Sequence, residues 1–193
     1  PQELVDSEIY NTAQLGQLYE QLNSRQYFSV YPPVCQFFFA LGALISPDDI
    51  LGSLIVIRLA FIVVELGTVL IILRLLRWLK LPLRLVLAYA LNPLVILELT
   101  GSLHLEILMI FFLVLAIYLL ALGRYWWSAL AMAFAVGAKL IPLIFMPLLF
   151  HYLLRRNWRV AIGYCAVVGI VVLLMFVPFV DLGQIQKILS SVK

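Results

Sequence analysis

The sequence contains little charge. Only 12% of its 193 residues are Asp, Glu, Lys or Arg, and 65% are apolar, whereas soluble domains average about 25% charged and about 45–50% apolar residues. A soluble chain of this length has too little interior to hide so many apolar side chains. The composition therefore excludes a disordered chain, a nucleic-acid-binding protein and a soluble enzyme, and it predicts a protein that lies in a membrane.

Cysteine is also scarce. The two cysteines, Cys35 and Cys165, lie far apart in separate apolar segments and show neither a CxxC pair nor the spacing of metal ligands. We expect both to be small buried side chains. No signal peptide or lipidation motif is recognisable, and the chain begins at Pro1 with a polar stretch. We therefore expect a fragment that is cut within a loop at both ends.

The apolar runs predict an all-α integral membrane protein, a multi-span helical bundle with short broken helices. A spanning helix needs about 20 mostly apolar residues, so the shorter run 34–45 predicts a re-entrant or interfacial helix. We expect a transmembrane domain over 33–181, between an outer loop segment at 1–32 and an outer amphipathic segment at 182–193. The spans predicted within this domain are 51–73, 81–98, 105–122, 126–138, 140–154 and 160–180.

The segments 126–138 and 140–154 belong to one long apolar run that Lys139, Pro142 and Pro147 interrupt. Prolines suit broken helices, because each removes a backbone donor. Two short helices, each roughly 20 Å long at 1.5 Å per residue, would form a hairpin with Lys139 at its apex.

Lysine and arginine set the predicted orientation. Three short connections, at 74–84, 124 and 155–159, contain eight of the thirteen cationic residues and no acid. The positive-inside rule places such connections in the cytoplasm. Nine of the ten acidic residues then lie on the outer face, and His104 and Lys139 lie there with them.

The first candidate site is the short outer connection between the spans 81–98 and 105–122. It contains Glu98, His104 and Glu106, and ionisable residues at a membrane boundary are functional candidates. Three interpretations stay open: contact with a substrate sugar or phosphate, a hydrogen-bonded polar turn, and a metal site. Carboxylate and imidazole groups are metal ligands, but the spacing matches no established metal signature, so we expect no resident metal ion.

Cationic residues within the apolar runs are further candidates. A lysine at position 139 is costly there unless it is paired or functional, and at the apex of the hairpin Lys139 could hold a lipid phosphate as a point charge. Snorkelling to the interface is the alternative. Arg58 and Glu65 lie seven residues apart and share a helix face, so we expect a buried structural pair or network, with Arg58 near enough to the outer end to reach a phosphate.

The outer segment adds weaker candidates. Asp6 and Glu8 could act as a general base on a hydroxyl, although a solvated loop explains them equally well. The Tyr31-Pro32-Pro33 step is stiff, because each proline fixes φ and restricts the residue before it. Tyr31 is then either an interfacial anchor or part of the entrance for a substrate.

Several of these segments together resemble the GT-C superfamily of integral-membrane glycosyltransferases, and specifically its bacterial, polyprenyl-phosphate-sugar-dependent, mannosyltransferase-like members. The order and spacing of the motifs over nearly the whole chain carry the resemblance. The motifs are SVYPPVCQFF at 29–38, Arg58, NPLVILE at 92–98, GSLHLE at 101–106 and KLIPLIFMP at 139–147.

The resemblance implies transfer of a sugar, with mannose as the first expectation, from a polyprenyl phosphate to an acceptor hydroxyl on the outer face. Lys139, with Arg58 or His104, would then stabilise the departing phosphate. Glu98 and Glu106 would bind sugar hydroxyls or the acceptor, and Tyr31 would line the entrance. The resemblance implies no cofactor besides the lipid-linked donor.

The implied partners are the lipid bilayer, the lipid-linked donor and a glycan, lipid or protein acceptor, and the implied location is a bacterial inner membrane with a periplasmic active face. Family members carry an acidic, aromatic-rich motif after an initial transmembrane helix. Residues 1–32 contain no convincing copy of it, so we expect the main catalytic carboxylate upstream of Pro1 and further spans after Lys193.

Two other functions stay open on the sequence. Broken helices with polar residues also suit a transporter or flippase of lipid-linked sugars, but the sequence shows no inverted repeat. An inactive scaffold that resembles the enzymes is the second alternative, because the acidic motif is missing from the chain.

Overall fold

A computed structural model describes residues 31–47 and 49–179. The chain divides into two compact units, residues 1–31 and residues 32–193. Tyr31 is the described residue of the first unit. All elements below belong to the second unit, and every regular element in its described part is helical. The predicted all-α membrane bundle is confirmed.

Seven α-helices and four short helical segments follow one another in this described part. The helices long and apolar enough to cross a membrane are α4 and, together with η4, α9. The elements are α3 (Pro33–Ile45), α4 (Ile50–Trp78), η1 (Leu83–Leu85), α5 (Val86–Ala90), η2 (Val95–Gly101), α6 (Glu106–Ala121), α7 (Tyr125–Ala138), η3 (Ile141–Phe145), α8 (Met146–Leu154), α9 (Trp158–Phe176) and η4 (Val177–Phe179).

Local sequence explains where the two long helices begin. The Asp49 side chain accepts hydrogen bonds from the backbone N–H groups of Leu51 and Gly52, both at 3.0 Å, and so caps α4. Asn157 caps α9 in the same way, accepting from the N–H of Arg159 at 2.9 Å. Such caps satisfy N–H groups that have no partner within the helix.

The segment 81–98, predicted as a span, is not one continuous helix. It consists of η1 and α5, a break around Asn92 and Pro93, and the π-helix η2, which extends to Gly101. The Asn92 side chain accepts a hydrogen bond from the N–H of Leu94 at 3.0 Å, an arrangement that competes with helical hydrogen bonding. Pro93 supplies no N–H to continue the helix.

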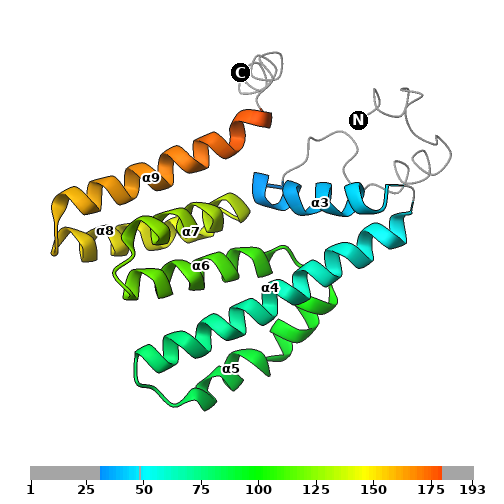
Figure 1. The fold of residues 1–193 in the computed structure, drawn as a ribbon, viewed down its shortest axis with the longest axis horizontal. Coiled ribbons are helices and arrows are strands. Elements are labelled where there is room, and N and C mark those ends of the chain that lie inside the picture. The colour runs from blue at the N-terminus through cyan, green and yellow to red at the C-terminus, as the bar shows by residue number, and fades with distance from the viewer. Residues whose placement is uncertain (1–30, 48, 180–193) are drawn as a thin grey trace. The chain divides into compact units, whose positions relative to one another are not determined.

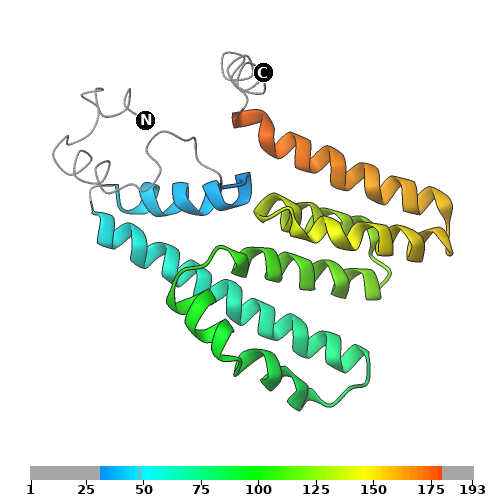
Figure 2. The same cartoon turned by 180° about the vertical axis from the view of Figure 1, so that it is seen from behind.

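The chain turns back at Lys139, where the sequence predicted the apex of a hairpin. Helix α7 ends at Ala138, and Lys139 is extended, with φ −160° and ψ 143°. The chain then returns through η3 and α8, each with a proline in its first two positions, where a missing N–H costs nothing. Figures 1 and 2 show α7 and α8 running in opposite directions, and α9 packs against both.

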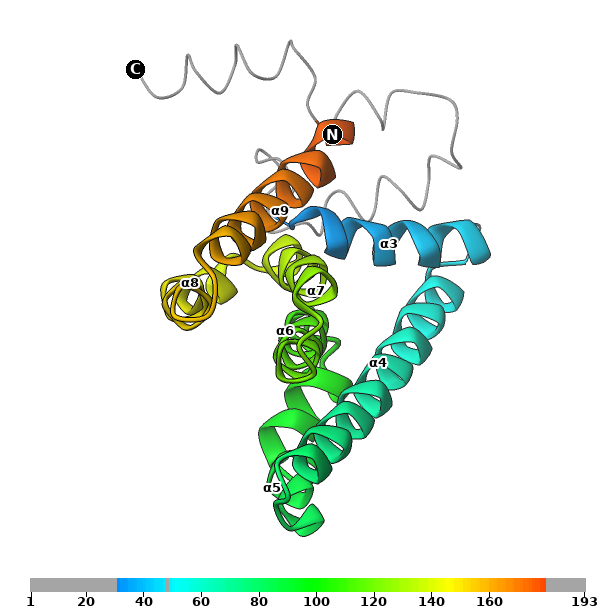
Figure 3. The same ribbon diagram turned by 60° about the vertical axis from the view of Figure 1, so that its left-hand side comes forward.

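Two clusters of buried side chains hold the helices together. The first joins α6, α7, α8 and α9 around Met132, Leu153 and Tyr164. The second joins α3, α4, α6 and the end of α7 around Cys35 and Phe61. Cys35 is 1% exposed, as predicted, whereas Cys165 is only partly buried. Figure 3 shows α6 and α7 between α4 with α5 on one side and α8 with α9 on the other.

The turns sort into two ends of the bundle. The connections α4–η1, α6–α7 and α8–α9, which contain the basic residues, lie together at one end (Figure 1). The η2–α6 loop and the break after α7 lie at the opposite end (Figure 2). One orientation in a membrane therefore puts all three basic connections on the same face, which is the pattern that the positive-inside rule requires.

Candidate functional site

The candidate site is an ion pair at the end of the bundle opposite the basic turns. The Lys139 ammonium donates to the Glu106 carboxylate. Glu106 is the first residue of α6, and Lys139 directly follows α7. Because α6 and α7 are antiparallel neighbours, the start of one and the end of the other meet. Both side chains are 41% exposed, so the pair is within reach of a ligand.

The pair suits anion binding better than it suits stability. An ion pair this exposed contributes about 0–1 kcal/mol to folding. The carboxylate holds the ammonium group in one place, and it leaves two ammonium protons to donate to another acceptor. A carboxylate in the first turn of α6 also lies at the positive end of that helix dipole. The arrangement can therefore present a fixed positive charge beside a hydrogen-bond acceptor.

The loop before α6 brings two more candidates to the same place. His104 is close enough to Glu106 to interact with it electrostatically. Arg58 of α4 donates through a guanidinium nitrogen to the carbonyl of Gly101 at 3.2 Å. Within the loop, Leu103 has φ of 55°, a left-handed conformation that costs a branched residue energy. Arg58 thus tethers a strained loop that presents His104.

Arg58 and Glu65, for which the sequence predicted a buried structural pair or network, contact different neighbours. Arg58 bonds to Gly101, and Glu65 instead accepts a hydrogen bond from the Tyr89 hydroxyl of α5 at 3.1 Å. Seven residues of helix separate the two positions by about 10 Å along the axis, so each side chain meets a different neighbour. The two residues therefore make different contacts along α4, Arg58 near the candidate site and Glu65 in the middle of the helix, where α4 meets α5.

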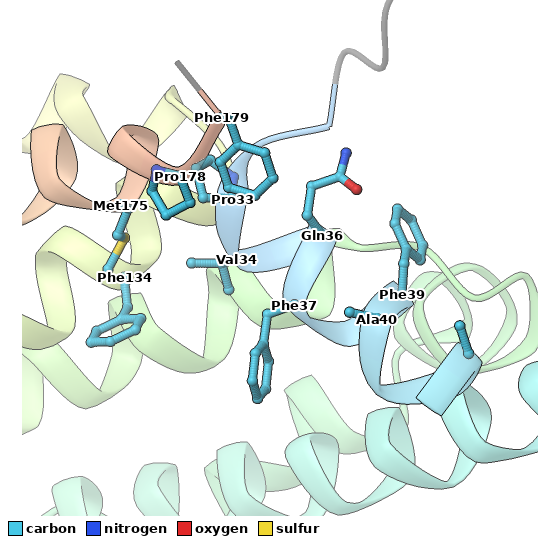
Figure 4. A pocket seen from close by; sticks show the side chains of 11 residues that line it. Pro33, Val34, Gln36, Phe37, Phe39, Ala40, Phe134, Met175, Pro178 and Phe179 are labelled. Atoms are coloured by element: carbon cyan, nitrogen blue, oxygen red, sulfur yellow. The ribbon is translucent and has the colours of Figure 1, made fainter. Parts of the chain in front are cut away.

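An apolar groove of about 660 Å³ lies between α3, α7, α9 and η4. Of its lining residues Gln36 alone is polar, and Figure 4 shows the others converging from three parts of the chain. The residues that define it best are Val34 and Phe37 of α3, Phe134 of α7, and Met175 and Phe179 at the end of α9.

The groove adjoins the break that holds Lys139. A Cβ atom on Gly137 would lie 2.7 Å from the Met175 sulfur and 3.1 Å from a methyl group of Val34, so α3 and α9 approach α7 closely at that glycine. The Cys35 thiol donates to the Ala138 carbonyl at 3.4 Å. The groove wall thus continues into Gly137 and Ala138, the residues directly before Lys139.

The roles of Asp6, Glu8, Glu98 and Tyr31 stay predictions. Asp6 and Glu8 lie outside the described residues. Glu98 lies on η2, where the description is limited to the backbone. Tyr31 is exposed and is the last residue of the first unit, so its role stays a prediction. Within 31–47 and 49–179, no group of three or more His, Cys, Asp or Glu side chains could hold a metal ion.

Comparison with protein families supplies the identity of this arrangement. Residues 25–155 match the model of the N-terminal domain of the alpha-(1->6)-mannopyranosyltransferase family. The chain belongs to this family. The resemblance to mannosyltransferase-like enzymes is therefore confirmed, and the protein is a membrane glycosyltransferase. Comparison with curated proteins and with solved structures found no match.

The matched segment contains Lys139 and Glu106, which form the ion pair, and it also contains Arg58 and His104. The groove residues of α9 follow it. Family membership favours the mannosyltransferase over the transporter as the function of the chain. Sequence reasoning missed the groove, because its walls are ordinary apolar residues. Two features of the sequence could have pointed to it. One is the glycine at position 137, where α3 and α9 approach α7, and the other is the stiff proline step that begins α3.

Proposed function

We propose that this mannosyltransferase takes mannose from a polyprenyl-phosphate donor and transfers it to an acceptor hydroxyl at the end of the bundle where Lys139 lies. One observation carries the proposal: a fixed cation stands next to an apolar groove. A soluble nucleotide sugar has no part that needs such a groove, whereas a prenyl chain does. The proposal therefore assigns the groove to the lipid and the cation to its phosphate.

The groove is suited to part of the prenyl chain. Its lining is apolar apart from Gln36, and ligand sites of this kind combine an apolar wall with a few placed polar groups. The lipid can enter sideways from the bilayer, because α3 and η4 form one rim (Figure 4). A chain held there would bring its phosphate towards the break after Ala138.

The charge at Lys139 is suited to the leaving group. In the transfer, an acceptor oxygen forms a bond to the anomeric carbon, and the bond from that carbon to the phosphate oxygen breaks. The phosphate keeps the electron pair and gains negative charge as it leaves. A preorganised cation that faces this oxygen lowers the barrier. His104 and Arg58 lie on the same side and can add to the positive field.

Glu106 has two roles in this proposal. It holds Lys139 by the ion pair, and its second carboxylate oxygen can accept a hydrogen bond from a sugar hydroxyl. The proton of the acceptor hydroxyl goes to a carboxylate of the outer segment, for which Asp6 or Glu8 is the candidate. The acceptor is a glycan, lipid or protein, and an alpha-(1->6) product requires a primary hydroxyl on a sugar acceptor.

We also propose that the transfer takes place on the periplasmic side of a bacterial inner membrane. The support is the sorting of the turns. The basic connections lie at the end of the bundle away from Lys139, and basic connections remain in the cytoplasm.

A donor comparison tests the proposal. The complete enzyme is purified in lipid nanodiscs and supplied with mannose on a polyprenyl phosphate or on a nucleoside diphosphate. We expect transfer from the lipid donor alone, and we expect short-chain prenyl donors to require higher concentrations. Transfer from the nucleotide donor at an equal rate, or an indifference to prenyl length, would show that the groove does not bind the donor.

A further inference from the structure

The end of the bundle opposite the ion pair presents a compact basic surface. Four arginines, Arg124, Arg155, Arg156 and Arg159, lie on the α6–α7 and α8–α9 turns, and all four are exposed. We call these four residues the basic cluster. The proposed transfer reaction uses none of them, since Lys139 lies at the other end of α7.

The two turns form one surface. The Arg156 guanidinium donates to the hydroxyl of Tyr125, the first residue of α7, at 3.0 Å. Trp126 lies across α9 so closely that a Cβ atom on Gly163 would come within 2.8 Å of its ring. These contacts join turns that are about thirty residues apart in the sequence. The cluster is therefore a built arrangement that depends on the fold of both helix pairs.

Aromatic rings also position two of the guanidinium groups. Arg156 lies over the Tyr152 ring at 5.4 Å, and Arg159 lies over the Trp158 ring at 5.5 Å. A guanidinium on a ring face retains N–H donors in its plane. These donors can bind phosphate oxygens in pairs, which is the strongest form of such a contact.

The charge of the cluster has no counterpart in its own part of the chain. The sequence contains no Asp or Glu between Glu106 and Asp181. The N-termini of α7 and α9 point to the same end and add the positive ends of their dipoles. A surface with four arginines, two helix N-termini and no acid on α7, α8 or α9 attracts an anion from outside.

The position of the cluster indicates which anion. Trp126 and Trp127 in the first turn of α7 and Trp158 at the start of α9 are next to it in the chain and are 55%, 63% and 58% exposed. Exposed tryptophans gather at the level of the lipid headgroups, and that is where the phosphates of anionic lipids lie. A soluble anion would need no aromatic rim.

We propose that the basic cluster binds the phosphate of an anionic phospholipid headgroup, in a site separate from the transfer site. The lipid is a resident ligand of this face and not a substrate. The α4–η1 connection supplies a comparison within the same chain, because Arg74, Arg77 and Arg84 lie on or beside it. It carries similar charge, and Figure 3 shows it well apart from the α8–α9 turn.

The test uses the complete, delipidated protein in a neutral detergent, titrated with phosphatidylglycerol, with phosphatidylcholine or with inorganic phosphate. Binding is followed by the thermal transition and by lipids retained in native mass spectra. Two triple variants are compared: R155Q/R156Q/R159Q in the cluster and R74Q/R77Q/R84Q as the charge-matched control. The variant Y125F, which removes only the hydrogen bond to Arg156, is a milder third form.

We expect phosphatidylglycerol to raise the thermal transition of the native protein more than phosphatidylcholine does. The cluster variant should bind phosphatidylglycerol roughly a hundredfold more weakly, and the control variant within about threefold of the native value. If the cluster variant folds poorly, Y125F takes its place and must also bind phosphatidylglycerol more weakly than the native protein, by a smaller factor. Equal losses in both triple variants, no preference for phosphatidylglycerol, no loss in Y125F, or an equal shift with inorganic phosphate would each overturn the proposal.

Discussion

Lys139, which follows α7, forms an ion pair with Glu106, which begins α6, across 33 residues of sequence. The pair exists because two antiparallel helices end and begin at the same level of the bundle. Neither residue could be buried alone at this place, since an unpaired charge in an apolar segment is expensive. The pairing with Glu106 therefore allows a charged lysine to occupy this position, where it can act on a ligand.

A charge exchange separates a catalytic role of this pair from a structural one. We expect K139Q to lower kcat/KM about a hundredfold to a thousandfold, as the loss of one stabilising group for a developing charge does. The free energy of unfolding should change by less than about 1 kcal/mol, because the pair is half exposed. Transfer assays and chemical denaturation in nanodiscs measure both quantities.

The double variant K139E/E106K restores the attraction with the charges exchanged. We expect it to fold with near-native stability and to remain inactive, because a carboxylate then lies where the phosphate leaves. The matched control is K80Q, a lysine in the basic α4–η1 connection, which should transfer mannose at the native rate. Recovery of activity in the exchanged pair would mean that the two residues only hold α6 and α7 together.

Arg58 should act through the loop that it holds. Its hydrogen bond to the Gly101 carbonyl is exposed, so R58Q should cost about 1 kcal/mol or less in stability. We expect faster hydrogen exchange at residues 101–105 and a fall in kcat of about tenfold, since a small misplacement at a reacting centre is costly. R74Q, on the same helix but outside this contact, is the control. Unchanged exchange in R58Q would contradict the tether.

Filling the groove should impair the use of long lipids selectively. Ala40 lines the groove and is exposed, so A40W places an indole where the prenyl chain is expected. We expect KM for a long-chain donor to rise about tenfold, which corresponds to losing roughly 1.4 kcal/mol of apolar contact. A donor with a very short prenyl chain should show little change.

The control for the groove is A88W, an exposed alanine on α5, well away from α3 and α9. It adds the same indole to an apolar helix face and should leave both donors unaffected. An equal rise of KM in A40W for short and long donors would indicate a general distortion of α3 and would remove the groove from the donor site.

Some of this site could be predicted from residue order alone. A lysine followed by two prolines in an apolar run is costly in a straight helix, so the break at Lys139 and its place beside an acidic loop followed from local chemistry. The end at which the basic turns gather followed in the same way, because the chain reverses its direction between one basic turn and the next and so returns to the same end of the bundle.

Other features depend on contacts that no local pattern encodes. The groove needs α3, α7 and the end of α9 to meet, and its residues are apolar like most of the chain. The partner of Arg58 is a backbone carbonyl 43 positions away, which no side-chain pattern marks. The interruption at Asn92 and Pro93 was visible in the sequence, but its consequence, a π-helix that ends at Gly101, depends on how that segment packs on α4.

The buried contact between α6, α7 and α9 should govern stability without affecting chemistry. Ser128 donates to the Ala116 carbonyl at 2.7 Å, so the fully buried Tyr164 hydroxyl donates to Ser128 at 3.1 Å. S128A leaves that hydroxyl unpaired and should cost about 1–3 kcal/mol, whereas Y164F removes the donor itself and should cost less. Both changes affect the same hydrogen bond. The double variant S128A/Y164F should therefore lose about 0.6 kcal/mol less free energy of unfolding than the two single variants lose together. Unfolding in mild detergent measures all four forms, and strictly additive losses would mean that the two hydroxyls are not bonded. Mannose transfer per folded molecule should stay native throughout, since Ser128 lies in the first turn of α7 and Lys139 follows its last.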